Sequence, residues 1–388
     1  MRGLPFDYAT RNLGRSPGRL AGALLGSTLV TLLVIASASF IRGMGASLDP
    51  PAGNSNVIFL GAGSEESVER SEIRMQAADV VGTISGLRTR LGQPFISPEV
   101  HIGLAVRTDP AEPEGRLTPL RGVRPSAFLV HSEVQITEGR APVAGANELL
   151  VGGLVSGQLG VPDARLGLGE VLHIDGREWR IVGRMRAPRT VIDAEIWIPL
   201  TDLQVIAQRD NLSCVIATLV PGEADITDAE ILAAQRLDLE LAVMTESEYY
   251  ATLSRFYAPV RAMVLATALL VALGGILGGL NTMVAAFASR VREVGTLQVI
   301  GYPRRAIILS FLQESWIISS CGALVAGALG WAVLDGVAVR FSMGAFGLIV
   351  DAPVLAIGVG AGLGLGLLGA LPPTIHCLRL PVGQALKS

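Results

Sequence analysis

Four long apolar runs constrain the fold of this chain more than any other feature of its sequence. A hydrocarbon core of about 30 Å is crossed by roughly 20 helical residues, each rising 1.5 Å. Runs of this length predict transmembrane helices at residues 20–41, 258–288, 306–334 and 353–371. The composition agrees, because 50% of the 388 residues are hydrophobic although the centre of the chain is polar.

The charges beside these runs predict the orientation of the chain. The loop 289–305 carries Arg290, Arg292, Arg304 and Arg305 against a single carboxylate, Glu293. Arginine clustered in a short loop indicates the cytoplasmic side of a membrane. The segments then assigned to the cytoplasm are residues 1–19, 289–305 and 372–388, and those assigned to the outside are residues 42–257 and 335–352.

A cleaved signal peptide is the competing interpretation of the first apolar run. Ala36-Ser37-Ala38 resembles a cleavage site. However, the apolar region of a signal peptide spans only about 7 to 15 residues, and this run is longer. We therefore expect a transmembrane helix whose N-terminus lies inside the cell.

Residues 42–257 contain no apolar segment of membrane-spanning length and form the predicted extracytoplasmic domain. Its two ends, about 55–107 and 212–245, predict a split α/β module. The elements expected there are strands at 57–60, 80–85, 100–107, 215–220 and 241–244 and helices at 65–77, capped by Ser64, and at 226–237.

Residues 115–205 separate the two ends and read almost entirely as short strands. Asp175-Gly176 is the strongest hairpin signal and joins predicted strands at 171–173 and 179–182. A further strand is expected at 191–198. The predicted fold is therefore a polytopic α-helical membrane protein with four transmembrane helices and a large extracytoplasmic α+β domain, in which a β-rich insertion interrupts the α/β module.

The chain is predicted to return to the membrane through a helix that begins at Thr245. Thr245 and Glu248 form a capping box, which satisfies two free backbone N–H groups. Since no clear stop follows until about Ser289, this helix would continue into the second span as a stiff rod. Pro259 permits a bend, and an ordinary helix that breaks there is the alternative.

The loop 289–305 contains a pattern that positive charge alone does not explain. Val291, Val294, Leu297 and Ile300 fall at helical spacing, and Gly301 follows the run. This pattern predicts a short helix across the cytoplasmic mouth of the spans. The positive-inside rule accounts for the arginines but not for the interleaved glycine and apolar residues.

Small and acidic residues inside the spans indicate contact sites. Glycines at four-residue spacing allow close approach by another copy or by the chain's own helices. The glycines concerned are Gly274, Gly275, Gly278 and Gly279 in the second span and Gly358, Gly362 and Gly366 in the fourth. Glu314 in the third span is either functional, or it reaches the interface or pairs with Arg304 or Arg305.

The sequence argues against nucleotide binding, metal binding and catalysis by this chain. Its single lysine is Lys387, so it has no Walker A loop, and we expect any ATP to bind another subunit and no cofactor to bind here. Cys214 is the only cysteine in the predicted outer domain, which excludes a disulfide there. The four histidines have no companions at ligand spacing, so no metal site is predicted. They are His101, His131, His173 and His376.

The pattern R-x-R-E-V-G-T-L-x-x-I-G-x-x-R-R, from Arg290 to Arg305, closely resembles the signature of the FtsX/MacB family of ABC-transporter permeases. The match continues into Gln313 and Glu314 and into the closing run RLPVGQALKS. The string EGRAP...NELLVGG, residues 138–153, is similar to that family's outer domain. A β-rich insertion in an α/β module resembles the paired porter and sabre subdomains of MacB-type permeases.

The resemblance implies that the loop 289–305 docks on a separate ABC ATPase subunit. In this family two permeases, identical or related, work with two ATPases, so a homodimer or a pair of related chains is implied in the bacterial cytoplasmic (inner) membrane. ATP binding would move the outer domains to export or extract a substrate, with a periplasmic membrane-fusion protein as a further partner. The residues that match the coupling motif are Arg290, Arg292, Glu293, Gly295, Gly301, Arg304 and Arg305.

A non-transporting signalling subunit is the second interpretation. In that case the outer domain would regulate an extracytoplasmic partner such as a cell-wall hydrolase, and ATPase motion would serve only as a signal. Nothing in residues 42–257 chooses between export, lipoprotein release and regulation. A neighbouring gene for a membrane-fusion protein would favour export, whereas one for a hydrolase would favour regulation.

Overall fold

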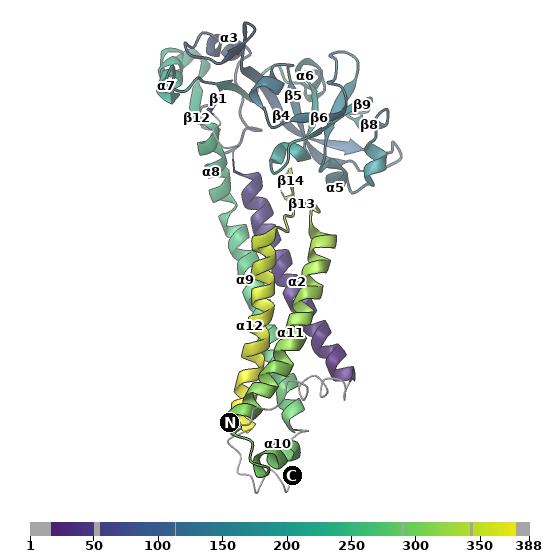
Figure 1. The fold of residues 1–388 in the computed structure, drawn as a ribbon. Helices are drawn as coiled ribbons and strands as arrows, with labels where there is room; N and C mark the ends of the chain where they lie inside the picture. Colours follow the sequence, from purple (N-terminus) through teal and green to yellow (C-terminus); the bar gives the residue numbers. More distant parts are fainter. Residues whose placement is uncertain (1–16, 50–54, 113, 289–290, 342–343, 378–388) are drawn as a thin grey trace. The chain divides into compact units, whose positions relative to one another are not determined.

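The computed structural model describes residues 17–49, 55–112, 114–288, 291–341 and 344–377 (Figure 1). The chain divides into two compact units. The first, called here the membrane unit, comprises residues 1–42, 259–336 and 348–388. The second, called here the outer unit, comprises residues 43–258 and 337–347, so it is built from two separate stretches of chain.

The membrane unit contains the four predicted membrane helices, and this prediction is confirmed. They are α2 (Pro17–Ser47), α9 (Ala258–Ala288), α11 (Arg304–Leu334) and α12 (Ala352–Cys377). Each is long and apolar enough to cross a membrane. The helix α2 continues to Ser47, beyond its expected end at residue 41. The structure does not describe most of the two predicted cytoplasmic termini, since residues 1–16 and 378–388 lie outside the described residues.

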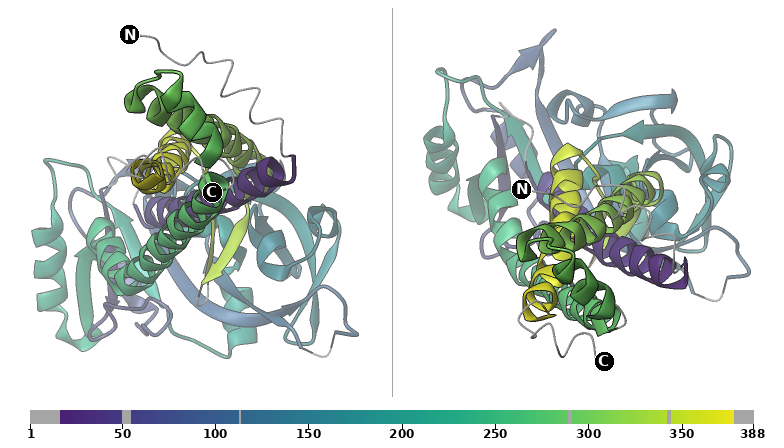
Figure 2. Two further views of the ribbon diagram at one scale, coloured as in Figure 1. Left: turned by 90° about the horizontal axis from the view of Figure 1, so that it is seen from below. Right: turned by 60° about the horizontal axis from the view of Figure 1, so that its bottom comes forward.

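Glycines on α12 allow close contact with two neighbouring helices. A Cβ atom at Gly358 would overlap Ile35 of α2, and one at Gly366 would overlap Ser319 of α11. A Cβ at Gly362 would lie 2.6 Å from Thr31 Oγ1 of α2. The two views in Figure 2 show α11 and α12 side by side. This face of α12 therefore packs against the chain's own helices.

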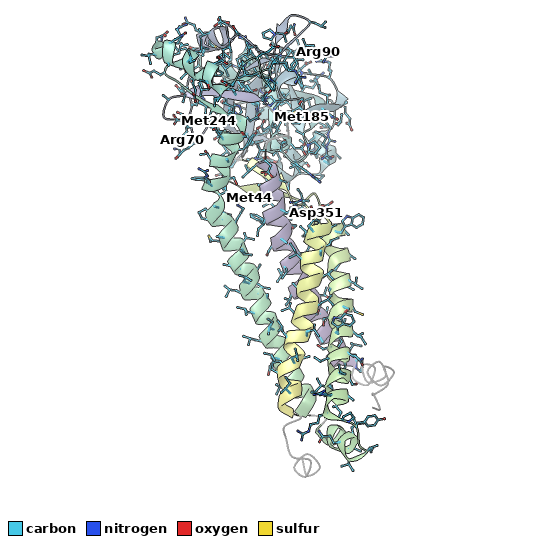
Figure 3. The ribbon with its side chains drawn as sticks, turned by 60° about the vertical axis from the view of Figure 1, so that its left-hand side comes forward. Met44, Arg70, Arg90, Met185, Met244 and Asp351 are labelled. Carbon is cyan, nitrogen blue, oxygen red and sulfur yellow. The ribbon has the colours of Figure 1, made fainter. Side chains whose placement is uncertain are left out.

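An ion pair also joins α2 to the residue that precedes α12. Arg42 Nε donates to Asp351 Oδ2 at 3.0 Å. Asp351, labelled in Figure 3, also accepts from the backbone N–H of Val354 in the first turn of α12. An acceptor at this position satisfies one of the free N–H groups at a helix start.

The glycines of α9 face two different environments. A Cβ at Gly275 would lie 2.9 Å from Val30 of α2, and one at Gly279 would lie 3.9 Å from Gly369 of α12. Within the described residues, no heavy atom lies within 4 Å of a Cβ built at Gly274 or Gly278. The sequence allowed these glycines to pack either against another subunit or against the chain's own helices. In the structure Gly275 and Gly279 pack against the chain's own helices.

The outer unit is organised around a ten-stranded sheet. Its strand order is β12-β1-β11-β4-β5-β10-β7-β9-β6, and β8 pairs with both β4 and β9. The strands are β1 (Asn56–Gly61), β4 (Ile96–Arg107), β5 (Arg116–Val123), β6 (Gln135–Gly139), β7 (Glu148–Gly152), β8 (Val171–Ile174), β9 (Arg177–Arg186), β10 (Ile196–Pro199), β11 (Cys214–Thr218) and β12 (Leu241–Thr245). A separate two-stranded ribbon is formed by β2 (Thr89–Arg90) and β3 (Gln93–Pro94).

The long strand β4 connects the two halves of this sheet. Residues 96–99 pair with β11, which comes from the late part of the domain. Residues 100–106 pair with β5, which belongs to the insertion. The predicted split α/β module with a β-rich insertion is therefore confirmed, and one strand belongs to both parts.

Short helices cover the sheet and complete its hydrophobic core. They are α3 (Gln76–Val81), α4 (Ala127–Val130), α5 (Val155–Leu159), α6 (Leu200–Ala207), α7 (Ile226–Gln235) and α8 (Glu246–Phe256), with 3-10 turns η1 (Asp163–Leu166), η2 (Val191–Ala194) and η3 (Leu237–Leu239). Every residue of β1 is buried, because alternate side chains enter different clusters. Val57 and Phe59 pack with Ala77 and Val81 of α3, whereas Ile58 and Leu60 pack with Val130 and Tyr249.

Most elements with strong local signals match their predictions. The strands β1, β11 and β12 and the helix α7 lie close to their expected positions, and α7 carries a capping box between Asp225 and Asp228. Asp175 and Gly176 have φ angles of 50° and 71° and join β8 to β9. Positive φ at both positions is the requirement of the tight hairpin turn that an Asp-Gly pair predicts.

The predicted helix at 65–77 is wrong, because distant backbone groups hold this segment in an extended and turned form. Gly61 N–H donates to Ser71 Oγ at 2.8 Å, and Ile73 exchanges two backbone hydrogen bonds of 2.8 Å with Leu212. The helix α3 begins only at Gln76. The predicted strand at 80–85 is also wrong, since residues 80–81 complete α3 and Gly82 N–H bonds back to Ala78.

The insertion contains more helix than predicted. The expected strand at 191–198 is divided, because residues 191–194 form the 3-10 turn η2 and only residues from Ile196 belong to β10. The helices α5 and α6 occupy segments that were expected to be strands or loops. Leu200, Leu203 and Ile206 on one face of α6 are buried, so packing against the sheet stabilises this helix.

The helix that leaves the outer unit is interrupted at one residue. The capping box of Thr245 and Glu248 is confirmed at the start of α8. However, α8 ends at Phe256, Tyr257 has φ −88° and ψ 1°, and α9 begins at Ala258. Pro259 has no N–H to bond Arg255 O, and its ring crowds that carbonyl. The prediction of one uninterrupted helix is therefore wrong. The interruption lies at Tyr257, two residues before the position at which the alternative expected a break.

The segment between α11 and α12 is a hairpin that belongs to the outer unit. Its strands are β13 (Ala338–Phe341) and β14 (Gly344–Gly347). Arg340 Nη2 donates to Gly157 O of α5 at 3.0 Å. A Cβ at Gly157 would overlap Ala338, so glycine allows the hairpin to approach α5 closely. The sequence predicted only a short outer loop at 335–352.

We predict that Gly358→Ala destabilises the helix packing of the membrane unit, whereas Gly360→Ala does not. The added methyl group at Gly358 would overlap Ile35, and overpacking a close contact costs about 1–3 kcal/mol. No heavy atom lies within 4 Å of a Cβ at Gly360 in the described residues, so it is the matched control. Thermal unfolding in detergent measures the difference, and equal stability of the two variants would contradict this packing.

Candidate functional site

The loop between α9 and α11 contains the short helix α10 (Val291–Val299), which confirms the predicted helix. The chain reverses sharply after it. Gly301 N–H bonds Gln298 O, and Tyr302 N–H bonds Leu297 O, each at 3.1 Å. Gly301 has a φ angle of +96°, which glycine adopts without the steric cost of a Cβ atom. Pro303 then precedes the first residue of α11.

One side of this reversal is packed and the other is open. Leu297 and Tyr302 pack around Ile307, which is fully buried at the start of α11. Val299 and Ile300 instead remain 65% and 66% exposed. Arg304 and Arg305 on the first turn of α11 are also exposed. We call Val299, Ile300, Arg304 and Arg305 the α10–α11 surface.

The other residues predicted for this site lie in different settings. Arg290 is outside the described residues, as are the side chains of Arg292 and Glu293. Gly295 is buried, so it does not offer an open surface for a partner. Glu314 is half-buried on α11. Of the predicted residues whose surroundings the structure describes, Gly301, Arg304 and Arg305 are exposed, and Val299 and Ile300 beside them were not among the predicted site residues.

A second group of chemically reactive side chains lies in the outer unit, on four adjacent strands. Cys214 of β11 is opposite Glu99 of β4, and His101 of β4 is opposite Arg121 of β5. Arg121 is in turn opposite Trp197 of β10. Residues at positions i and i+2 of a strand share a face, so the register aligns these side chains in one row. We call Glu99, His101, Arg121, His131 and Glu195 the buried polar cluster.

Arg121 binds two carboxylates in this cluster. Its Nε and Nη2 donate to the two oxygens of Glu195 at 2.7 and 2.6 Å. Its Nη1 donates to Glu99 Oε2 at 2.8 Å. Trp197 Nε1 also donates to Glu195, at 2.9 Å. The planar guanidinium therefore makes a bidentate pair on one side and a single bond on the other, the geometry that favours arginine at buried ion pairs.

Two histidines approach Glu99 from different elements. His131, at the C-terminal end of α4, has Nε2 2.7 Å from Glu99 Oε1. His101 has Nε2 2.9 Å from Glu99 Oε2. The Nδ1 atom of His131 lies 3.6 Å from Glu133. The prediction that the histidines lack companions at ligand spacing is therefore wrong for His101 and His131, each of which lies within 3 Å of Glu99.

The cluster is buried, and its charges compensate one another. Burial raises the pKa of Glu99, but the charges of His131 and Arg121 outweigh it and hold that pKa well below its usual range. Burial lowers the pKa of His131, but Glu99 and Glu133 raise it to about 10. Burial likewise lowers the pKa of Arg121, but Glu195 and Glu99 raise it well above its usual value. Glu99 is therefore ionised, and both of its cationic partners are charged.

Paired and buried in this way, Glu99, Arg121 and Glu195 are not placed to act as free acids or bases. Their pairing stabilises one arrangement of β4, β5 and β10, because removing any partner would leave a buried charge without compensation. Sequence reasoning missed the cluster. The local signal was the presence of Glu99 and His101 at alternate positions of one strand. Their partners are distant in sequence, because Glu99 is 22 residues from Arg121 and 32 from His131, and Arg121 is 74 residues from Glu195.

Two family models match successive parts of the chain. The MacB-like periplasmic core domain model matches residues 20–234, and the FtsX-like permease C-terminal model matches residues 265–382. An ABC transporter permease of Bacillus subtilis (strain 168), YknZ, is 22% identical over 387 residues, which cover 96% of this chain and 95% of that protein. The macrolide export ATP-binding/permease protein MacB of Shewanella sp. (strain W3-18-1) is 24% identical over 228 residues, covering 56% of this chain and 35% of that protein. The crystal structure of the periplasmic region of MacB from Actinobacillus actinomycetemcomitans, 12% identical with a TM-score of 0.39, covers 52% of this chain and 94% of that one.

We predict that Arg121→Leu strongly destabilises the outer unit. The substitution leaves Glu99 and Glu195 without their shared cation, and breaking a buried ion pair in this way costs about 3–5 kcal/mol. Arg140→Leu is the matched control, because it removes an arginine whose pair with Glu148 is at the surface. Thermal unfolding of the detergent-solubilised protein, followed by circular dichroism, checks both variants. A melting temperature for Arg121→Leu as high as that of Arg140→Leu would contradict the stabilising role of the cluster.

Proposed function

Because the chain belongs to the MacB/FtsX family of ABC transporter permeases, whose MacB-like model alone matches residues 20–234, we propose that it couples ATP hydrolysis by a separate ATPase to movement of its outer domain. The movement would export or extract a substrate. The observation that carries this proposal is the α10–α11 surface. It places two exposed aliphatic residues and two exposed arginines in the loop that joins two membrane helices.

The composition of this surface suits a protein partner. Single exposed aliphatic residues are common on proteins, but Val299 and Ile300 are adjacent and lie beside Arg304 and Arg305. Apolar residues with arginine at the edge are typical of protein interfaces. The tight turn at Gly301 holds Ile300 next to the start of α11, so a partner bound there would act directly on a membrane helix.

The ATP site is proposed to lie on that partner. The chain has a single lysine, Lys387, and therefore no Walker A motif of its own. Its match to YknZ, which is named as a permease, extends over 95% of that protein, whereas the match to the combined ATP-binding/permease protein MacB covers 35% of it. Both observations support an ATPase in a separate chain and no cofactor bound to this one.

Movement of the membrane helices would reach the outer unit along three covalent routes. The helix α2 itself continues from the membrane unit into the outer unit after residue 42. The helix α9 connects to α8 through the joint at Tyr257. The helices α11 and α12 connect to the hairpin β13–β14, which is part of the outer unit and bonds to α5 through Arg340. A shift of these helices would therefore act on the outer unit through three separate stretches of chain, and a rigid rod is not required.

We also propose two further partners and the cellular location. Gly274 on α9 offers space for the close approach of a second permease subunit, identical or related. A periplasmic membrane-fusion protein would be a further partner in an exporter. We propose the bacterial inner membrane as the location, with both termini and α10 in the cytoplasm, since arginine is concentrated in those segments.

We predict that cysteines on the two units react on opposite sides of the membrane. Cys214 is fully buried and cannot report the orientation of the native protein. Leu91 is 99% exposed on the β2–β3 ribbon, and Val299 is 65% exposed after α10. In a background in which the native cysteines are replaced, a membrane-impermeant maleimide should label Leu91→Cys on spheroplasts and Val299→Cys only after lysis. Labelling of Val299→Cys on sealed spheroplasts would reverse the proposed orientation.

We predict that Ile300→Asp disrupts binding of the ATPase. A carboxylate in place of an apolar contact residue should lower the recovered ATPase about tenfold or more, as loss of a central interface residue typically does. Leu237→Asp is the matched control, because Leu237 is 79% exposed on the outer unit, away from α10 in the chain. The measurement is recovery of a Walker-motif ATPase, identified by mass spectrometry, with tagged protein from native membranes. Equal recovery with both variants would reject the α10–α11 surface as the docking site.

A further inference from the structure

Three potential metal ligands converge at one edge of the buried polar cluster. Glu99 Oε2 and His101 Nε2 lie 2.9 Å apart, and His101 Nε2 lies 3.7 Å from Cys214 Sγ. All three donor atoms lie within 4.8 Å of one another. The convergence follows from the sheet, since Glu99 and Cys214 are cross-strand partners and His101 is two residues along on the same face.

This geometry is not that of a catalytic thiol. In a nucleophile–histidine–acid arrangement, the acid contacts one ring nitrogen and the nucleophile contacts the other. Here both Glu99 and Cys214 face Nε2 of His101. Cys214 is also fully buried, and burial raises the pKa of its thiol well above the usual value. The three atoms therefore meet at one point and do not form a relay.

The dimensions of the group suit a small divalent ion. Zinc lies about 2.0–2.3 Å from nitrogen, oxygen and sulfur ligands, so the ligand atoms of a tetrahedral site are roughly 3.3–3.6 Å apart. The distances of 2.9 and 3.7 Å bracket this range. An adjustment of a few tenths of an ångström would bring Glu99 and His101 into this range, and Sγ of Cys214 lies within 4.8 Å of both of their ligand atoms.

The surroundings of the three residues suit the same ligand. Metal-binding carboxylates are usually held by hydrogen bonds from a second shell of residues. Glu99 accepts such bonds from Arg121 at 2.8 Å and from His131 at 2.7 Å, and Glu195 holds Arg121 in turn. The carboxylates Glu99, Glu133 and Glu195 outnumber the two cations, so an added positive charge is electrostatically acceptable.

We propose that Glu99, His101 and Cys214 form a binding site for a divalent transition-metal ion of the zinc class. On binding, the thiol of Cys214 releases its proton to solvent, and Nε2 of His101 binds through its lone pair with the ring proton on Nδ1. Only the His101 side chain has solvent exposure, 16%, so the ion enters and keeps a water ligand on that side. The ion would bind β4 to β11 and so link the early and late segments of the outer unit.

The test uses full-length protein in detergent, with Cys321→Ser and Cys377→Ser, stripped with chelator and kept in a thiol-free reductant. Cobalt(II) is the probe, because a cobalt–thiolate bond gives a charge-transfer band that a nitrogen and oxygen site lacks. We expect one equivalent of Co²⁺ to produce this band and Zn²⁺ to remove it. Cys214→Ser should abolish the band, and His101→Ala should weaken binding about 100-fold or more, beyond the loss typical of a second-shell change.

Control variants distinguish a specific metal site from non-specific binding of the metal ion. His173→Ala is the matched control, because His173 of β8 is also a partly buried histidine near a carboxylate, with Nε2 3.8 Å from Glu178. It should leave the cobalt spectrum unchanged. Cys214→Ala provides a second thiol-free variant, and circular dichroism shows whether each variant is folded. No band in the folded parent protein, an unchanged band in a thiol-free variant, or equal affinity after His101→Ala would each overturn the proposal.

Discussion

The change of partner along β4 is the constraint on which the outer unit depends. Glu99 is the last residue paired with β11, and Val100 is the first paired with β5. The buried polar cluster lies at this junction. A one-residue slip of β4 would move Glu99 and His101 to the opposite face of the sheet and leave Arg121 without one of its carboxylates. The cluster therefore favours a single register where two parts of the domain, far apart in sequence, must meet.

Local sequence signals were sufficient for elements whose geometry is decided locally. The hairpin at Asp175-Gly176, the capping box of α8 and the reversal at Gly301 all depend on residues within a few positions of one another. Membrane helices are predictable for a similar reason, since length and hydrophobicity decide them. Local signals failed at residues 65–77, where hydrogen bonds from Gly61 and Leu212 outweigh helix propensity.

The two candidate sites differ in the same way. Arg304 and Arg305 of the α10–α11 surface were predicted because the arginines and glycines of this loop are close together in the chain, whereas the exposure of Val299 and Ile300 and the burial of Gly295 were not. The polar cluster could not be predicted, because Glu99 meets His131 across 32 residues and Arg121 meets Glu195 across 74. Glu99 and Cys214 are farther apart still and adjoin only because β4 pairs with β11. Such contacts depend on sheet register, which one sequence without relatives does not specify.

The hairpin β13–β14 has a consequence for how the protein is made. Residues 43–258 leave the ribosome first, but residues 337–347, which complete the same unit, are synthesised only after α9 and α11. Domains made from the N-terminus fold as their sequence becomes available. Until then the surface of α5 around Gly157 lacks the hairpin that packs on it in the finished protein, and Arg340 can bond there only once α11 has been synthesised. The outer unit therefore cannot be completed from its first stretch of chain alone, and its last contacts depend on residues made after the third membrane helix.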